Sequence, residues 1–280
     1  MGRKRNTTNS IAGTYEISTG ELVVEPDPFR DGAFILNVNG VPSSHLIPDE
    51  PRTLEFEYMR WIAAAVENLA PGKRLLHLGG GGCSLPRYFA DLWPDSHNTV
   101  VELDAKLAEL IRELADIPSA PRVKIRAGEA RAVTEGFPPN RFDVIIRDVF
   151  AGDTTPKPLT TQEFFQHAHA TLSPGGLYVA NCGDHSDLQG AKAELAGMAE
   201  VFAHVAVIAD PPMLKGRRYG NIILIGSDSE LPVDGSPDSA ALAKPLLSGA
   251  VPAHFRDESW TRRFLKGATP RRDAAATAED

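Results

Sequence analysis

Apolar and polar residues alternate in short runs near the start of the chain. Between residues 14 and 57 the runs are TYEIS, ELVVEP, AFILNVNGV and SSHLI, and turn residues separate them. A period of two over so few residues is typical of half-buried strands. Asn39-Gly40, inside the third run, is a strong hairpin signal. We therefore expect a small antiparallel β-unit over residues 13–57.

The spacing of apolar positions changes after this unit. A helix is predicted over residues 53–69, and Pro71-Gly72 ends it. Its apolar stripe consists of Leu54, Met59, Ile62, Val66 and Leu69.

Predicted strands and helices then alternate along the chain. The strands are RLLHLG (74–79), NTVVELD (98–104), VKIRAG (123–128), FDVIIRDVF (142–150) and GLYVANC (176–182). The helices between and after them are SLPRYFADLW, AKLAELIRELA, TTQEFFQHAHATL and a segment near 188–200. This alternation predicts a parallel, doubly wound α/β sheet.

The last two predicted strands differ from the others. HVAVIAD (204–210) and GNIILIGS (220–227) have no predicted helix between them, so we expect an antiparallel pair. A mostly parallel, seven-stranded sheet with an antiparallel final hairpin resembles the Rossmann-like fold of class I S-adenosylmethionine-dependent transferases. On this basis we expect a nucleoside-binding catalytic domain at 58–232 and a C-terminal extension at 233–267. The ends, 1–12 and 268–280, have the composition of disordered segments.

Net charge and hydrophobic content indicate which kinds of binding partner to expect. The 280-residue chain has a net charge of −8, which disfavours binding to a nucleic-acid backbone. The basic start lacks an apolar run behind it, and no stretch approaches the roughly 18 apolar residues that cross a bilayer. We therefore expect a cytoplasmic protein without a membrane partner.

Cysteine and histidine spacing predicts neither disulfides nor a metal site. Cys83 and Cys182 form no CxxC pair. His167 and His169 are two residues apart, so on a helix they point to different faces.

A glycine loop carries the clearest local chemistry. Gly79, Gly80 and Gly81, followed by Gly82, lie between a strand and a helix, where backbone N–H groups can approach a ligand closely. Glu102 ends the next strand, and a carboxylate at that place can accept both hydroxyls of a ribose. Glu129 follows the third strand, where it either meets an adenine amino group or is a surface residue. Together these residues predict a nucleoside site.

Asp148 is the catalytic candidate. It closes the apolar strand FDVIIRD, at the sheet edge where ligands bind in such folds. The following segment, VFAGDTTPKPLTT, has the length and the Gly and Pro content of a lid and contains Asp153. Two carboxylates near one pocket can hold an ammonium group and accept a proton from an attacking amine. The alternative is that Asp148 only caps the loop after it.

The order of these motifs resembles the spermidine synthase family of aminopropyltransferases, including its bacterial spermidine synthase-like branch. The resemblance covers residues 34–227 through FILNVNGVPSSH, LEFEYMRWI, LGGGGCSLPR, VVELD, GEARA, FDVIIRDVF and LTTQEFF…LSPGGLYVANC. It implies transfer of an aminopropyl group from decarboxylated S-adenosylmethionine to putrescine, with release of methylthioadenosine. It also implies a homodimer formed through the N-terminal β-unit.

The resemblance assigns roles to individual residues. The three glycines Gly79–Gly81 would line the nucleoside, Glu102 would hold its ribose, and Glu129 would approach the adenine. Asp148 would act as acid/base, and Tyr58 would lie beside the polyamine.

The chain departs from the family pattern in the part that would bind the amine. Gly82 and Cys83 stand where the family motif GGGDG has Asp and Gly, and Val149 and Phe150 follow Asp148 in the lid. Two alternatives therefore stay open. One is an S-adenosylmethionine-dependent methyltransferase, because Gly82 would not repel the carboxylate of the intact cofactor. The other is a non-catalytic nucleoside-binding relative.

Overall fold

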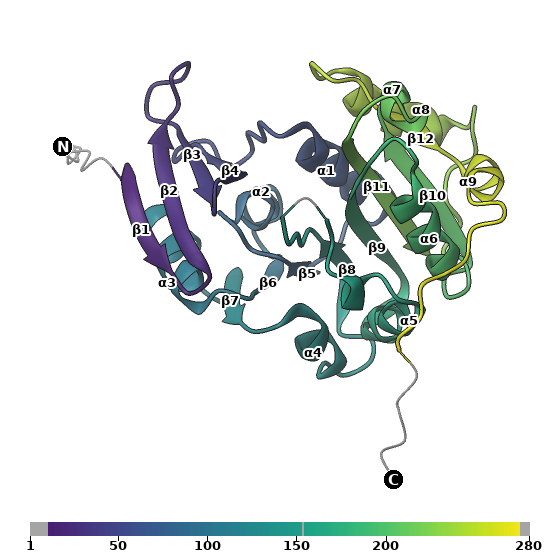
Figure 1. The fold of residues 1–280 in the computed structure, drawn as a ribbon, viewed down its shortest axis with the longest axis horizontal. Helices are drawn as coiled ribbons and strands as arrows, with labels where there is room; N and C mark the ends of the chain where they lie inside the picture. Colours follow the sequence, from purple (N-terminus) through teal and green to yellow (C-terminus); the bar gives the residue numbers. More distant parts are fainter. Residues whose placement is uncertain (1–10, 153, 275–280) are drawn as a thin grey trace, which may run out of the picture.

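The computed structural model describes residues 11–152 and 154–274 and contains two sheets (Figure 1). The N-terminal sheet is an antiparallel meander of β1 (Gly13–Ile17), β2 (Gly20–Pro26), β3 (Phe34–Val38) and β4 (Val41–Leu46). Asn39 and Gly40 join β3 to β4 with φ values of 52° and 77°, as a type I′ hairpin turn requires. The predicted antiparallel β-unit is confirmed.

The second sheet has the strand order β12-β10-β11-β9-β8-β5-β6-β7. Its strands are β5 (Arg74–Leu78), β6 (His97–Glu102), β7 (Val123–Ala127), β8 (Phe142–Arg147), β9 (Leu172–Asp184), β10 (His204–Ala209), β11 (Gly220–Ser227) and β12 (His254–Arg256). The strands from β9 to β7 are parallel, whereas β11, β10 and β12 pair in antiparallel fashion. This confirms the mostly parallel sheet and its antiparallel final pair. The eighth strand, β12, comes from the C-terminal extension and is too short to leave a period-two pattern.

The helices are α1 (Glu57–Leu69), α2 (Ser84–Leu92), α3 (Ala105–Leu114), α4 (Ala130–Glu135), α5 (Gln162–Thr171), α6 (Gln189–Met198), α7 (Pro211–Leu214), α8 (Pro237–Leu247) and α9 (Glu258–Phe264), with the 3-10 turn η1 (Lys157–Leu159). The predicted helices are present as α1, α2, α3, α5 and α6 with different ends, whereas α4, α7, α8 and α9 are not among the predicted ones. A single helical turn, α7, lies between β10 and β11, where no helix is expected. None of the helices in the described part of the chain has the length and apolar character needed to cross a membrane.

Alternate side chains of the parallel strands pack on opposite faces of the sheet. Along β8, Ile145 packs with the apolar residues of α5 and α6, whereas Val144 and Ile146 pack with those of α1 and α8. A third apolar cluster lies between the N-terminal sheet, α3 and β6. The N-terminal sheet is therefore packed onto the larger sheet, and Figure 1 shows its purple strands beside α3.

Asp104 makes the main polar contact between the two sheets. It caps α3 by accepting from the Leu107 N–H at 2.9 Å, and it also accepts from the backbone N–H groups of Ser18 and Thr19 in the β1–β2 turn. Burial raises the pKa of this carboxyl, but the hydrogen bonds outweigh burial and lower the pKa to about 2. An ionised Asp104 thus holds the N-terminal sheet in place.

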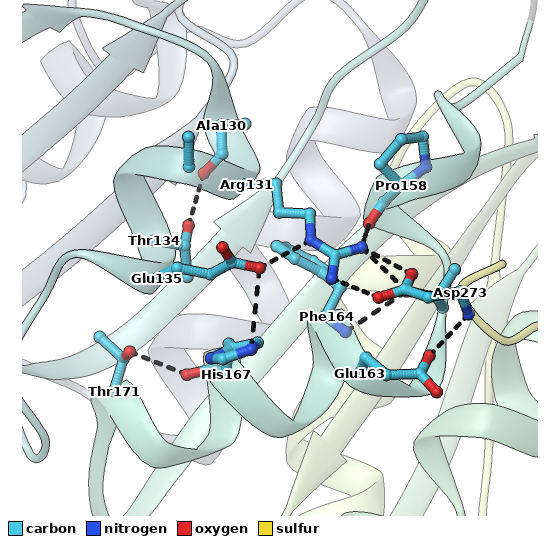
Figure 2. Close-up of polar contacts among 12 residues, drawn as sticks. Ala130, Arg131, Thr134, Glu135, Pro158, Glu163, Phe164, His167, Thr171 and Asp273 are labelled. Atoms are coloured by element: carbon cyan, nitrogen blue, oxygen red, sulfur yellow. Dashed lines mark hydrogen bonds and ion pairs between the residues drawn. The ribbon is translucent and has the colours of Figure 1, made fainter. Parts of the chain in front are cut away.

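The segment after α9 is hydrogen-bonded to α4 and α5 (Figure 2). The guanidinium of Arg131 in α4 donates to both carboxylate oxygens of Asp273, at 2.7 and 2.5 Å, and to the carbonyl of Pro158 at 3.2 Å. The Gln162 N–H donates to the carbonyl of Arg271 at 2.9 Å. Residues 268–274 therefore do not belong to a disordered tail as predicted, because Asp273 donates its backbone N–H to Glu163 and accepts from Arg131 with its carboxylate, 110 and 142 residues away in the sequence. Residues 275–280 of that predicted tail, and residues 1–10 of the predicted N-terminal one, lie outside the described residues.

Replacing Asp104 with Asn tests the contact between the sheets. The folded pKa of about 2 lies below the usual 3.8, so ionised Asp104 stabilises the fold above pH 4 and this contribution is lost as the pH falls towards 2. We expect D104N to lower the free energy of unfolding at pH 7 by about 2 kcal/mol, measured by urea denaturation. The difference from wild type should shrink between pH 5 and pH 2. D49N, at an exposed position, is the control, and a difference that does not change with pH would contradict the assignment.

Candidate active site

The glycine loop follows β5 and leads into α2. Gly79 and Gly81 have φ values of 91° and 47°, in the left-handed region that favours glycine. A Cβ on Gly79 would lie 2.1 Å from the carbonyl oxygen of Asp148. Gly79 is therefore required by the close approach of the chain after β8 as well as by its own turn.

Glu102, at the end of β6, holds the glycine loop. Its Oε2 accepts from the N–H groups of Gly80 at 2.9 Å and Gly81 at 3.1 Å, and its Oε1 accepts from the N–H of Asp104 at 3.0 Å. A carboxylate offers about four acceptor sites, so these three bonds leave about one. Binding both hydroxyls of a ribose would therefore require Glu102 to release part of the loop. The sequence pattern pointed to the ligand contact and missed this internal role.

The next two positions of the loop pack against the N-terminal sheet. The Gly82 N–H donates to Ser44 Oγ of β4 at 2.8 Å, and a Cβ on Gly82 would lie 2.6 Å from Ser44 Cβ. The space that the Asp of GGGDG would need is thus filled by Ser44. Cys83 is buried with a φ of 56°, and burial raises the pKa of its thiol to about 12, so it is a neutral packing residue.

Asp148 and Tyr58 lie together in this structure. Asp148 follows β8 and is half-buried, and its Oδ1 accepts from Asn181 Nδ2 at 3.0 Å. Burial raises the pKa of Asp148, while hydrogen bonds from Asn181 and Tyr58 oppose that rise. Burial, and then the charge of Asp148, raise the pKa of Tyr58 well above its usual value. Tyr58 is therefore a neutral phenol beside the Asp148 carboxylate.

A buried ion pair contacts the backbone of Asn181. Arg147 and Glu194 are 0% and 2% exposed, and Arg147 Nη2 lies 2.6 Å from Glu194 Oε2 and donates to the Asn181 carbonyl at 3.2 Å. Sequence reasoning missed Arg147, Glu194 and Asn181. The sequence offered one signal, which is that Arg147 ends the otherwise apolar strand β8. A buried arginine needs a carboxylate partner, so this position pointed to an ion pair.

A cavity of about 750 Å³ lies between the glycine loop and Asp148, and its size is typical of small-molecule sites. Gly79, Gly80, Gly81, Glu102, Tyr58 and Asp148 all line it. The N-terminal sheet forms part of the wall through Val38 and the residues from Val41 to Ser44.

Two predicted site residues are not in this group. Glu129 is exposed and caps α4, accepting from the N–H groups of Arg131 at 2.9 Å and Ala132 at 2.7 Å. Its neighbours Gly128 and Ala130 line the cavity, and its contact with adenine stays a prediction. Asp153 lies outside the described residues.

The two histidines of α5 have different partners. His169 pairs with Asp228 at 2.6 Å, and His167 lies 3.7 Å from Glu135. In the ranges 11–152 and 154–274, no three His, Cys, Asp or Glu side chains are grouped as metal ligands.

A family model for the spermine/spermidine synthase domain matches residues 55–212, more than half of the chain. The chain belongs to the spermine/spermidine synthase family. Among curated proteins, the polyamine aminopropyltransferase of Vibrio vulnificus (strain CMCP6) is 29% identical over 134 residues, which are 47% of this chain and 45% of that protein. The match thus spans about half the length of this relative.

Solved structures of spermidine synthases share the fold. A crystal structure of a probable spermidine synthase from Corynebacterium glutamicum ATCC 13032 has a TM-score of 0.93 and 58% identity, over 96% of this chain and 99% of that one. A spermidine synthase in complex with the transition-state analogue AdoDATO has a TM-score of 0.62 and 21% identity, over 79% of this chain and 74% of that one. The second likeness shows the fold alone, and both confirm the predicted class I transferase architecture.

Replacing Glu102 with Gln tests its hold on the glycine loop. The amide keeps the size of the side chain but places an NH₂ group against the N–H of either the loop or Asp104. We expect E102Q to lower the free energy of unfolding by about 1–3 kcal/mol, the cost of leaving such a group unpaired, as measured by urea denaturation. E109Q on the exposed face of α3 is the matched control. Equal stability of E102Q and E109Q would show that Glu102 does not hold the loop.

Proposed function

We propose that this chain transfers the aminopropyl group of decarboxylated S-adenosylmethionine to a small amine and releases methylthioadenosine. The observation that carries the proposal is the half-buried Asp148, hydrogen-bonded by Asn181 and beside Tyr58, in the same cavity as the glycine loop and Glu102. Membership of the spermine/spermidine synthase family supports the same reaction. Putrescine is the acceptor that the family resemblance implies, and residues 58–232 would form the catalytic domain.

In this proposal the glycine loop and Glu102 bind the nucleoside. The sulfonium of the donor already activates the adjacent carbon, so the protein has to align the amine and take up a proton. The amine lone pair forms the new C–N bond, the C–S bond breaks, and its electron pair stays on sulfur as the thioether of methylthioadenosine. The proton lost by the amine nitrogen passes to the Asp148 carboxylate.

The surroundings of Asp148 suit this role. Its raised pKa makes it a stronger base than an ordinary carboxylate, Asn181 holds it by donating a hydrogen bond, and the neutral Tyr58 lies beside it. Asp153, in the segment after Asp148, is a further candidate for contact with the amine.

Methyl transfer from intact S-adenosylmethionine is the second candidate. The observation that favours it is Gly82, where Ser44 fills the place of a side chain and no carboxylate opposes the donor's own. The two reactions leave different products, because methyl transfer yields S-adenosylhomocysteine and aminopropyl transfer yields methylthioadenosine.

Replacing Asp148 with Asn tests the proposed base. D148N keeps the size of the side chain and an oxygen that accepts from Asn181, so we expect the protein to stay folded. Turnover, measured as methylthioadenosine release, should fall by roughly 10²–10⁴-fold.

The pH dependence gives a second readout on the same variant. Asp148 must be ionised to accept a proton, so wild-type activity should be lost as the pH falls through its raised pKa. D148N should lack this acid limb. D95N, at an exposed position, should behave as wild type, and undiminished turnover in D148N would exclude Asp148 as the base.

A further inference from the structure

His77 of β5 is a further polar residue in the wall of the cavity. We infer that its Nδ1 accepts a hydrogen bond from an amine N–H of the substrates, either that of the donor's aminopropyl group or that of the acceptor. This inference rests on the proposed function and adds a substrate-binding residue to the same cavity.

The register of the sheet places His77 near Asp148. His77 is paired with Ile146 of β8, and both residues line the cavity. Asp148 follows Ile146 by two positions, so the three side chains point to one face of the sheet, the face that packs against α1. One strand spacing and two residues of rise put the Cα atoms of His77 and Asp148 about 8 Å apart. A small amine can therefore contact both side chains.

Hydrogen bonds around Asn98 fix the tautomer of the imidazole ring. Asn98 Nδ2 donates to Ser96 Oγ at 3.0 Å and to the Arg122 carbonyl at 3.1 Å. Its Oδ1 lies 3.0 Å from His77 Nε2, and because this amide oxygen can only accept, Nε2 carries the proton. Burial lowers the pKa of His77 to about 4, so the ring is neutral at pH 7. Nδ1 is therefore an acceptor.

Nδ1 is open to the cavity. The residue is only 2% exposed, and its hydrogen bond to Asn98 uses Nε2 alone. No donor in the ranges 11–152 and 154–274 reaches Nδ1, yet it is not among the fully buried atoms without a partner, which include Asn181 Oδ1. A polar atom in a cavity wall is satisfied by water or by a ligand that donates to it, and an amine N–H is such a donor.

Two amide substitutions separate the roles of the two ring nitrogens. In H77Q the terminal NH₂ can donate to Asn98 in place of Nε2, and no acceptor is left where Nδ1 was. In H77N the shorter side chain puts its oxygen close to the place of Nδ1, and Asn98 loses its donor. H97Q, the same change at an exposed position of β6, is the matched control for H77Q. We expect the midpoint of urea unfolding to stay near that of wild type in H77Q and to fall in H77N.

Affinity for the substrates should change in the opposite order. A hydrogen bond to a charged amine corresponds to roughly a ten- to hundredfold change in affinity, so H77Q should lose this factor while H77N and H97Q stay close to wild type. Calorimetry gives Kd for decarboxylated S-adenosylmethionine and for methylthioadenosine, and methylthioadenosine release gives KM for putrescine. Weaker binding of the decarboxylated donor, with unchanged binding of methylthioadenosine, would assign Nδ1 to the aminopropyl group. A higher KM for putrescine alone would assign it to the acceptor.

Three results would overturn the inference. Unchanged Kd for the donor and unchanged KM for putrescine in H77Q would show that His77 serves only to hold Asn98. A larger loss of affinity in H77N than in H77Q would show the same. An equal loss of affinity for methylthioadenosine and for the donor would place Nδ1 against the nucleoside. Wild-type protein that releases no methylthioadenosine with any of a wide panel of amines would contradict the proposed function, whatever the result for H77Q.

Discussion

The close approach of two strand ends positions the whole site. The N–H of Asp148 donates to the carbonyl of Leu78 at 2.8 Å, and the carbonyl of Asp148 comes so near Gly79 that no side chain fits there. This contact brings the glycine loop of β5 and the carboxylate after β8 to the same cavity. In the proposed reaction, a nucleoside bound at the loop would lie next to the carboxylate that accepts the proton.

Hydrogen bonds between distant segments then fix each half of the cavity. Glu102 ties the loop to the start of α3, and Asp104, two residues on, ties α3 to the N-terminal sheet. On the other side, the buried Arg147–Glu194 pair holds the backbone of Asn181, whose side chain orients Asp148. Glu102 and Asp104 therefore both hold backbone N–H groups of distant segments, whereas Asp148 accepts from the side chain of Asn181 and lines the cavity.

The parts of this architecture that repeat locally could be predicted from the sequence. The alternation of strands and helices predicted the sheet, and the glycine run and Glu102 were predicted to share a site and do line one cavity. Contacts between single residues far apart could not be predicted, because no local pattern marks them. Ser44 under Gly82, Glu194 beside Arg147 and Asp273 beside Arg131 are separated by 38, 47 and 142 residues. Glu129 illustrates the reverse case, since a carboxylate at a strand end also precedes a helix and can be its cap.

Calorimetric titration of the purified protein with decarboxylated S-adenosylmethionine, intact S-adenosylmethionine and methylthioadenosine tests the central claim most directly. The account predicts that methylthioadenosine and the decarboxylated donor bind, and that the decarboxylated donor binds more tightly than the intact one. Tighter binding of intact S-adenosylmethionine would contradict aminopropyl transfer and favour a methyltransferase. Failure of all three to bind would contradict the assignment of the cavity to a nucleoside donor.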